Sequence, residues 1–131
     1  MGARAFAAAQ AMVGARFRVQ GRDAAGGLDC VGLVAAAYAA AGREVTAPSG
    51  YPLRGWARER IERGLAAAGF VAATGAACVG DVAMIRFPAG QFHLGLRGPD
   101  RVIHAHAGLR CVVAVPIDEM WRAAPRFRIA R

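Results

Sequence analysis

The spacing of the apolar positions changes once along the chain, near Val79. Before that point apolar residues recur at helical intervals, which predicts helices over residues 4–13, 30–41 and 54–68. After it, short apolar or alternating stretches are separated by turn-forming glycine, proline and aspartate, which predicts strands over residues 81–87, 91–96, 101–106, 109–115 and 127–129. Helices first and an antiparallel meander afterwards indicate an α+β domain.

The chain is short enough to form a single domain. Its 131 residues can bury one sizeable core but not two, so we expect residues 1–131 to fold as one unit. No apolar run approaches the roughly 18 residues that span a bilayer, and we expect no membrane span. Gln10 and Arg16 argue against an N-terminal signal peptide. We therefore expect the protein to stay in the cytoplasm, where it is made, or to leave it by lysis or inside a particle.

Arginine supplies all of the positive side-chain charge. The chain has 17 basic residues and a net charge of +8, with no lysine, no asparagine and a single serine, Ser49. These absences exclude a Schiff-base lysine, a P-loop lysine and a Cys-His-Asn catalytic set. The charge suits an acidic partner, such as nucleic acid, an anionic wall polymer or a carboxylate-rich peptide. Because the arginines are scattered rather than clustered with aromatic residues, we do not expect nucleic acid to be the partner.

Cys30 lies where a glycine-rich turn meets an apolar helical stretch, so it is expected at a helix N-terminus. The unpaired N–H groups and the helix dipole favour an anion there, which predicts a lowered thiol pKa and a nucleophilic thiolate. The same position also suits a small buried apolar residue, and this stretch alone leaves both interpretations open. Cys78 and Cys111 are most simply core or strand residues. Three cysteines without a CxxC pair suit a reducing compartment.

All three histidines fall in the predicted meander. His93 shares one strand face with Gly95, and His104 and His106 share one face of the next strand. A tight turn between these strands would bring His93 close to His104, and the helix that begins at Cys30 then needs only to pack its N-terminus against this face. Cys30 would attack, His93 would hold the proton and His104 would fix the tautomer of His93. A three-histidine zinc site is an alternative.

Three blocks, GLDCVGLV, GDVAMIRF followed by FHLGL, and VIHAHAG, resemble the NlpC/P60 cell-wall peptidases in order and spacing. The similarity is greatest to the short branch found in phage tails and gene-transfer agents. It implies a papain-like fold, no cofactor, and hydrolysis of peptidoglycan stem peptides, usually between D-γ-glutamate and meso-diaminopimelate. By motif, the resemblance assigns the nucleophile to Cys30, the base to His93 and the third catalytic position to His104.

Four further residues carry supporting predictions. The family commonly has a tyrosine where this chain has Phe17, whose ring remains but whose hydroxyl is missing. Gln20 is a candidate second oxyanion donor beside the backbone N–H of Cys30. Asp29 is most simply the cap of the helix that begins at Cys30. His106, two residues after His104, lies outside the matched position.

Two hypotheses of different classes follow. The first is a cysteine endopeptidase. Acyl transfer to an amine other than water is a further possibility, and it would use the same residues. The second is a structural or wall-binding module of a phage tail or gene-transfer particle, with activity weakened by the missing tyrosine hydroxyl. Tail or baseplate proteins would be its partners.

Overall fold

The computed structural model describes residues 1–45, 58–87 and 91–130. Three predicted features lie wholly or partly outside them: the loop at residues 47–52, which holds Ser49, the first turn of the third predicted helix, and the turn at residues 88–90. Among the described residues, no helix is both long and apolar enough to cross a bilayer.

The helices largely follow the predicted spans. α1 covers Gly2–Ala11, α2 covers Cys30–Ala40 and α3 covers Arg58–Ala67, and a short helix, α4, covers Glu119–Ala123. α2 ends immediately before Ala41 and Gly42, and Gly42 has the left-handed backbone (φ 94°) typical of a residue that follows a helix. On α3, Arg58 pairs with Glu62 at 2.7 Å, as four-residue spacing allows.

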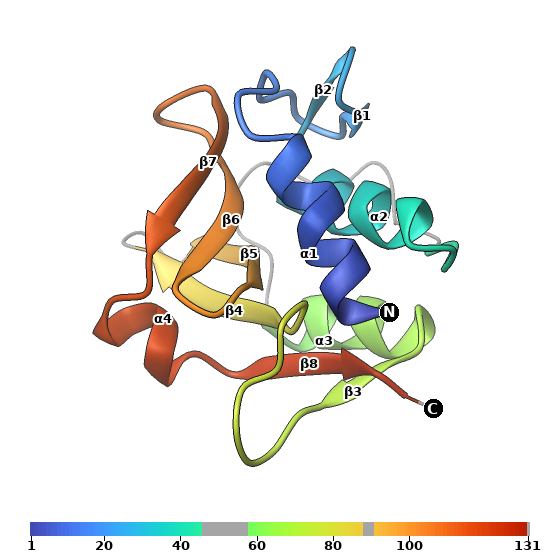
Figure 1. The fold of residues 1–131 in the computed structure, drawn as a ribbon, viewed down its shortest axis with the longest axis vertical. Helices are drawn as coiled ribbons and strands as arrows, with labels where there is room; N and C mark the ends of the chain where they lie inside the picture. Colours follow the sequence, from blue (N-terminus) through green and yellow to red (C-terminus); the bar gives the residue numbers. More distant parts are fainter. Residues whose placement is uncertain (46–57, 88–90, 131) are drawn as a thin grey trace.

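A six-stranded sheet, antiparallel throughout, occupies the second half of the chain (Figure 1). Its order is β3-β8-β4-β5-β6-β7, with the strands β3 Phe70–Ala72, β4 Val82–Phe87, β5 Gln91–Arg97, β6 Arg101–His106, β7 Cys111–Pro116 and β8 Arg126–Ile129. The predicted α+β class and the meander from β4 to β7 are therefore confirmed. A small ribbon of β1 (Arg22–Asp23) and β2 (Gly27–Leu28) precedes α2.

Four short elements were not predicted. β3 is three residues long, α4 is five residues long, and β1 and β2 have two residues each. Such short segments contain too few residues to display a period. The predicted strand at residues 127–129 corresponds to β8, which lies between β3 and β4 because β3 pairs with it on the outer side.

The sheet buries apolar side chains on both faces. One face carries Leu94, Leu96 and Ile103 and packs with α1, α2 and α3 in the larger core. The other face carries Ala83, Ile85 and Val102, and Trp121 of α4 covers it. The histidine-bearing strands β5 and β6 thus lie between two layers.

An ion-pair cluster fixes the start of β4. The carboxylate of Asp81 is almost fully buried and binds Arg126 at 2.8 Å and Arg128 at 2.7 Å, both on β8. These hydrogen bonds hold the pKa of Asp81 below its usual range, although burial acts in the opposite direction. The hydroxyl of Tyr38 on α2 donates to the carbonyl of the adjacent Gly80. These contacts connect α2, β4 and β8.

Candidate active site

Asp29 determines where α2 begins. Its side chain accepts a hydrogen bond from the Gly32 N–H at 2.8 Å, which is the N-cap arrangement, so the predicted capping role is confirmed. Its other carboxylate oxygen accepts from the Gln20 N–H at 2.7 Å, and Arg22 approaches at 3.2 Å. Cys30 is consequently the first residue of α2, as predicted.

The sulfur of Cys30 lies at an opening between β5 and β6. These strands pair only at Leu96 with Ile103 and at Arg97 with Val102, whereas β4 and β5 pair along six residues. The N–H of Met84, opposite Leu94, donates to Pro125 on the far side of β4, so the N–H of Leu94 faces away from β4. That N–H hydrogen-bonds the Cys30 thiol. The sulfur therefore lies beside the backbone of the residue that follows His93.

The electrostatic environment of this thiol differs from the sequence prediction. Burial raises the pKa of Cys30 to about 11, and the nearby Asp29 carboxylate acts in the same direction. The N–H groups of Leu94, Val31 and Cys30 itself lower the pKa, but by less. The prediction of a lowered thiol pKa is wrong, because desolvation of the thiolate outweighs the favourable helix terminus.

The three histidines gather on the face of the sheet opposite to α2. His93 lies in register with Ile85, and the ring centroid of His104 is 5.2 Å from that of Trp121, so both belong to the α4 side. The ring of His106 is 5.5 Å from that of His104. The body of α2 packs on the other face, in the larger core, while its first residue lies beside β5 through the Leu94 N–H. The approach of the α2 N-terminus to the histidine-bearing face stays a prediction.

Burial keeps two of the imidazoles neutral. It lowers the pKa of His93 to about 4, and a charge on His106 would lower it further. It also lowers the pKa of His104 to about 4, with added effects from His106 and His93. The predicted proximity of His93 and His104 agrees with this coupling. At neutral pH both buried rings can accept a proton.

The structure does not form the alternative zinc site. Within residues 1–45, 58–87 and 91–130, no group of three or more His, Cys, Asp or Glu side chains is arranged to hold a metal ion. His106 has a local partner instead, because its Nδ1 accepts a hydrogen bond from the Leu109 N–H at 3.0 Å, in the turn after β6. This hydrogen bond joins His106 to the turn that follows β6, and not to a metal ligand set.

Phe17 and Gln20 both lie in the segment that leads to the nucleophile. Phe17 is half-buried against the larger core, forms a bridge with Leu28 and donates its N–H to the Arg110 carbonyl at 2.9 Å. Gln20 has a left-handed backbone (φ 59°), and its own N–H binds Asp29. The Gln20 side chain as an oxyanion donor stays a prediction.

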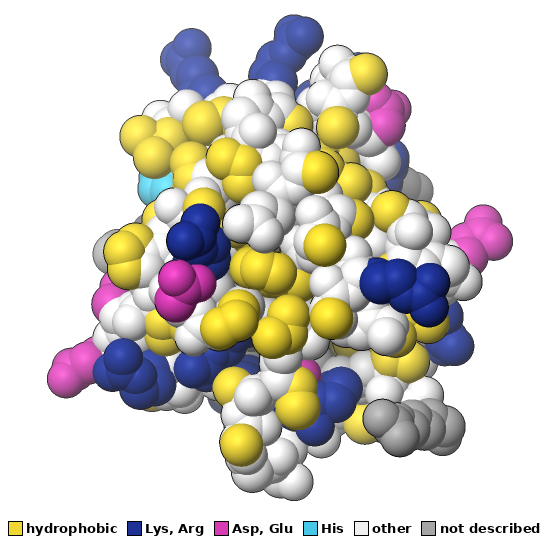
Figure 2. Space-filling view, in the orientation of Figure 1, with side chains coloured by type: hydrophobic (Ala, Val, Ile, Leu, Met, Phe, Trp, Pro, Cys, Tyr) yellow, Lys and Arg dark blue, Asp and Glu magenta, His cyan; other side chains and the backbone are white. Residues whose placement is uncertain are grey.

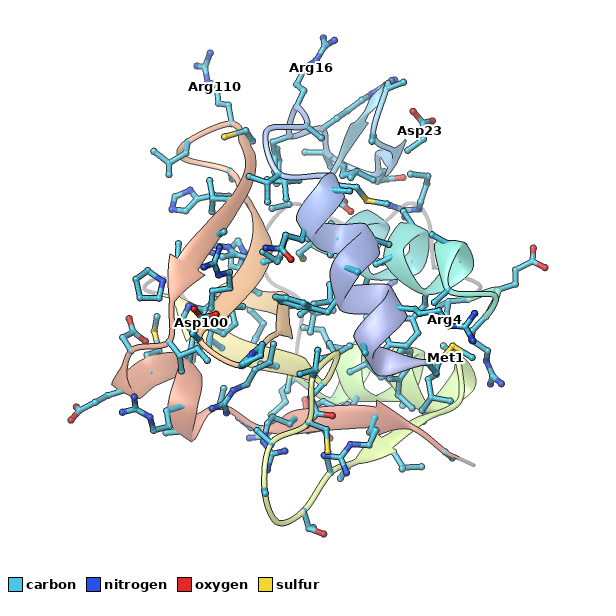
Figure 3. The ribbon with its side chains drawn as sticks, viewed as in Figure 1. Met1, Arg4, Arg16, Asp23, Asp100 and Arg110 are labelled. Carbon is cyan, nitrogen blue, oxygen red and sulfur yellow. The ribbon has the colours of Figure 1, made fainter. Side chains whose placement is uncertain are left out.

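Two arginines and one aspartate, Asp23, are labelled at this end of the molecule in Figure 3. Arg16 and Arg110 extend from the same end, away from the body of the protein (Figure 3). They belong to neighbouring segments, since Arg16 bridges to Cys111. Dark blue side chains mark the same end in the space-filling view, while the central face over α1 is mostly apolar (Figure 2). A carboxylate-bearing ligand near Phe17 would lie within a field of positive charge.

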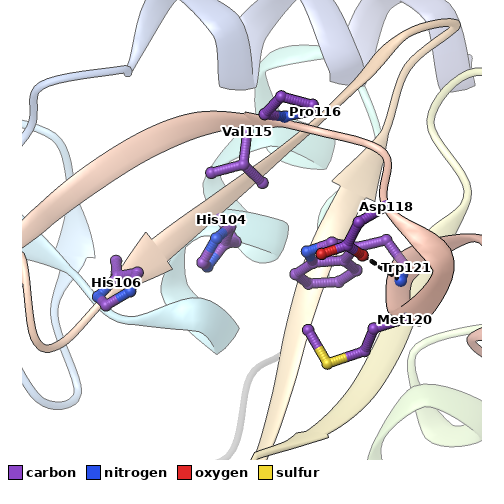
Figure 4. Close-up of a pocket in the computed structure, with 7 residues that line it drawn as sticks. All are labelled: His104, His106, Val115, Pro116, Asp118, Met120 and Trp121. Atoms are coloured by element: carbon purple, nitrogen blue, oxygen red, sulfur yellow. Dashed lines mark hydrogen bonds between the residues drawn. The ribbon is translucent and has the colours of Figure 1, made fainter.

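A pocket on the other side of His104 was not predicted. Its volume is about 330 Å³, and Figure 4 shows its lining residues, His104, His106, Val115, Pro116, Asp118, Met120 and Trp121. A Cβ added at Gly95 would lie 3.0 Å from the Trp121 ring, which explains a glycine after His93 and Leu94. The residues of α4 carried no sequence signal, because a five-residue helix is too short to display a period.

These groups together can support amide hydrolysis. The thiol of Cys30 lies among the backbone N–H groups of Leu94, Val31 and Cys30, beside the residue that follows the neutral imidazole of His93. An imidazole of low pKa takes the thiol proton only while the sulfur attacks the amide carbonyl. It then gives this proton readily to the leaving amine.

The fold is similar to that of solved NlpC/P60 domains. The NlpC/p60 domain of the peptidoglycan hydrolase SagA matches with a TM-score of 0.64 and 23% identity, over 100% of this chain and 99% of that one. NlpC2 and NlpC1 of Trichomonas vaginalis match with TM-scores of 0.69 and 0.63, each at 16% identity and over 98% of this chain. The chain spans less than half of each Trichomonas chain, 45% and 43%. At these identities the likeness shows the fold, and it confirms the predicted NlpC/P60 architecture.

Comparisons at the sequence level find nothing further. No protein-family model matches the chain, and no curated protein matches it.

Proposed function

We propose that this chain, which has the fold of NlpC/P60 domains, is a cysteine peptidase that hydrolyses the stem peptides of peptidoglycan. The observation that carries the proposal is the position of Cys30 at the start of α2, with its sulfur beside the β5 backbone next to His93. The bond we expect to be cut is the one between D-γ-glutamate and meso-diaminopimelate.

The reaction has two steps. The Cys30 sulfur attacks the amide carbonyl while its proton moves to His93, which then protonates the leaving amine. Water next gives a proton to His93 and attacks the thioester, which releases the acid and restores the thiol. The N–H groups of Cys30 and Leu94 stabilise the oxyanion, and one such donor contributes about 3–4 kcal/mol. His104 acts as a positioning residue, since its ring lies on the same face as His93.

Digestion of purified sacculi tests the proposal. Wild-type protein should release stem-peptide fragments with new termini at a single bond, identified by mass spectrometry. Cys30→Ala should release none, whereas Cys78→Ala is the matched control, because Cys78 is exposed. A chelator should leave the activity intact. Release by the Cys30→Ala protein at the wild-type rate would overturn the assignment.

A particle-mounted location is part of this proposal. The resemblance of the motifs to the phage-tail and gene-transfer branch supports it, and the abundance of arginine suits contact with an anionic wall. Detection of the protein in purified particles, together with tail or baseplate proteins, would test this location.

The raised pKa of Cys30 favours a second candidate, a wall-binding tail module with weak or no activity. The missing hydroxyl at Phe17 points the same way. Wild-type protein that cosediments with sacculi but releases no fragments would select this candidate over the peptidase.

A further inference from the structure

We propose that the pocket beside α4 binds an aliphatic side chain whose terminal carbon carries a primary ammonium group, and that Asp118 selects this group. The proposal rests on the proposed function, because within a stem peptide it assigns the pocket to the diamino acid on the leaving-amine side of the scissile bond. The pocket adjoins the candidate active site through His104, which lines it (Figure 4).

The charge of the lining points to a cation. Among its seven lining residues, the pocket has one carboxylate, Asp118, and no arginine, although the chain carries a net charge of +8. One oxygen of Asp118 accepts from the Trp121 N–H at 2.9 Å, and this bond fixes the carboxylate at the pocket rim. Apart from the imidazoles of His104 and His106, the lining has no basic side chain beside this carboxylate, which favours an ammonium group over an anion.

The walls of the pocket suit an aliphatic chain that carries this cation. Trp121, Met120, Val115 and Pro116 supply apolar surface, and the face of a tryptophan ring also attracts a cation. A volume of about 330 Å³ accommodates a single side chain rather than a larger group.

His104 lines the pocket and is only 3% exposed. Its Nδ1 is buried and has no hydrogen-bond partner among the residues that the structure describes, so the other atoms of the ring form its contribution to the pocket wall. Because its pKa is about 4, the ring is neutral and does not repel a cation at neutral pH.

The test measures binding and therefore needs no turnover. Cys30→Ala protein is titrated, by calorimetry, with a stem tetrapeptide whose side-chain amine is free and with the same peptide acetylated at that amine. We expect the free amine to bind about fivefold more tightly, since an exposed carboxylate and one aromatic face each contribute modestly. Asp118→Asn, which keeps a capping side chain, should reduce this ratio to near one. Glu119→Gln, which changes a neighbouring carboxylate outside the lining, should retain it.

A gain of binding complements this loss. Met120 is exposed at the rim, so Met120→Glu should tighten binding of the free-amine peptide, whereas Met120→Gln should not. Equal affinity for the two peptides, no measurable binding of either, or an unchanged ratio in both Asp118→Asn and Met120→Glu would overturn the proposal. Cleavage that depends on Cys30 but proceeds at the same rate with the free-amine and acetylated peptides would overturn this inference alone. Amine selectivity without cleavage would overturn only the proposed function.

Discussion

At the scale of single residues, Cys30 is subject to opposing influences. The N–H groups at the start of α2 and that of Leu94 stabilise a thiolate, while burial and Asp29 destabilise it. Burial dominates, and the pKa rises to about 11. The buried imidazole of His93 is likewise held neutral. The resting site therefore contains a neutral thiol and a neutral base, so the proton moves when the substrate carbonyl is attacked.

Alkylation by iodoacetamide should follow this pKa. Below pH 10, the rate at Cys30 should rise about tenfold per pH unit, and at pH 7 it should be at least tenfold slower than that of free cysteine. Intact-protein mass spectrometry of the Cys78→Ala/Cys111→Ala protein isolates the Cys30 reaction. A plateau that is reached below pH 8 would instead indicate a preformed thiolate–imidazolium pair.

A substitution at Phe17 should increase activity. Phe17→Tyr would add a hydroxyl to a half-buried ring in the segment next to Leu28, two residues before the nucleophile. If this hydroxyl holds the substrate, kcat/KM on a stem peptide should increase about fivefold, which corresponds to one hydrogen bond of about 1 kcal/mol. A Phe17→Leu protein serves as the control for ring packing. An unchanged or reduced kcat/KM in Phe17→Tyr would show that the hydroxyl is not needed here.

At the scale of secondary-structure elements, the site depends on where α2 begins and where β5 and β6 separate. The cap at Asp29 places Cys30 on the first turn, and the two-residue pairing of β5 with β6 leaves the opening that receives the sulfur. The almost fully buried carboxylate of Asp29 also gathers Gln20 and Arg22, so one side chain organises the segment before the helix.

Removing this cap should destabilise the protein strongly. Asp29→Ala should lower the free energy of unfolding by about 3 kcal/mol, because it removes a helix cap and leaves buried N–H groups without their acceptor. Urea unfolding measures the change. Asp23→Ala is the matched control, because Asp23 also accepts a backbone hydrogen bond, from Gly26, but at the surface. A loss at Asp29 no larger than that at Asp23 would contradict the organising role.

The sequence was sufficient to predict the elements that have clear periods or caps. The span of α2 followed from Asp29 and Gly42, and the strands β4 to β7 followed from the turns between them. It could not predict which sheet face α2 covers, because that depends on packing between residues distant in sequence. The predicted direction of the Cys30 pKa shift was wrong for the same reason, since burial of the thiol depends on tertiary structure. Asp118 was missed because α4, which it caps, is too short to show a pattern.

At the scale of the whole molecule, the sheet keeps two imidazoles in a desolvated layer. His93 and His104 must stay neutral in the folded protein down to about pH 4, whereas in the unfolded chain they take up protons below about pH 6.5. Between these values the unfolded state binds more protons, so stability rises with pH through this window. Protonation of Asp81 in the unfolded state belongs to a lower range, near pH 3.8.

The free energy of unfolding should therefore fall as the pH decreases from 6.5 to 4. Each buried imidazole should contribute up to roughly 3 kcal/mol to this fall, at about 1.4 kcal/mol per pKa unit. Urea unfolding at several pH values measures the slope, and His104→Gln should reduce it by about half. A stability that is constant or rises toward pH 4 would contradict the burial of neutral histidines.

The most direct test of the account is the capture of a covalent intermediate on Cys30. A soluble stem peptide is mixed with the protein, the reaction is quenched in acid within milliseconds, and the intact protein is weighed by mass spectrometry. We predict a mass increase equal to the acyl part of the peptide in the wild-type and Cys78→Ala proteins, and none in Cys30→Ala. Peptide cleavage by Cys30→Ala at the wild-type rate, or an acyl group located on any other residue, would contradict it.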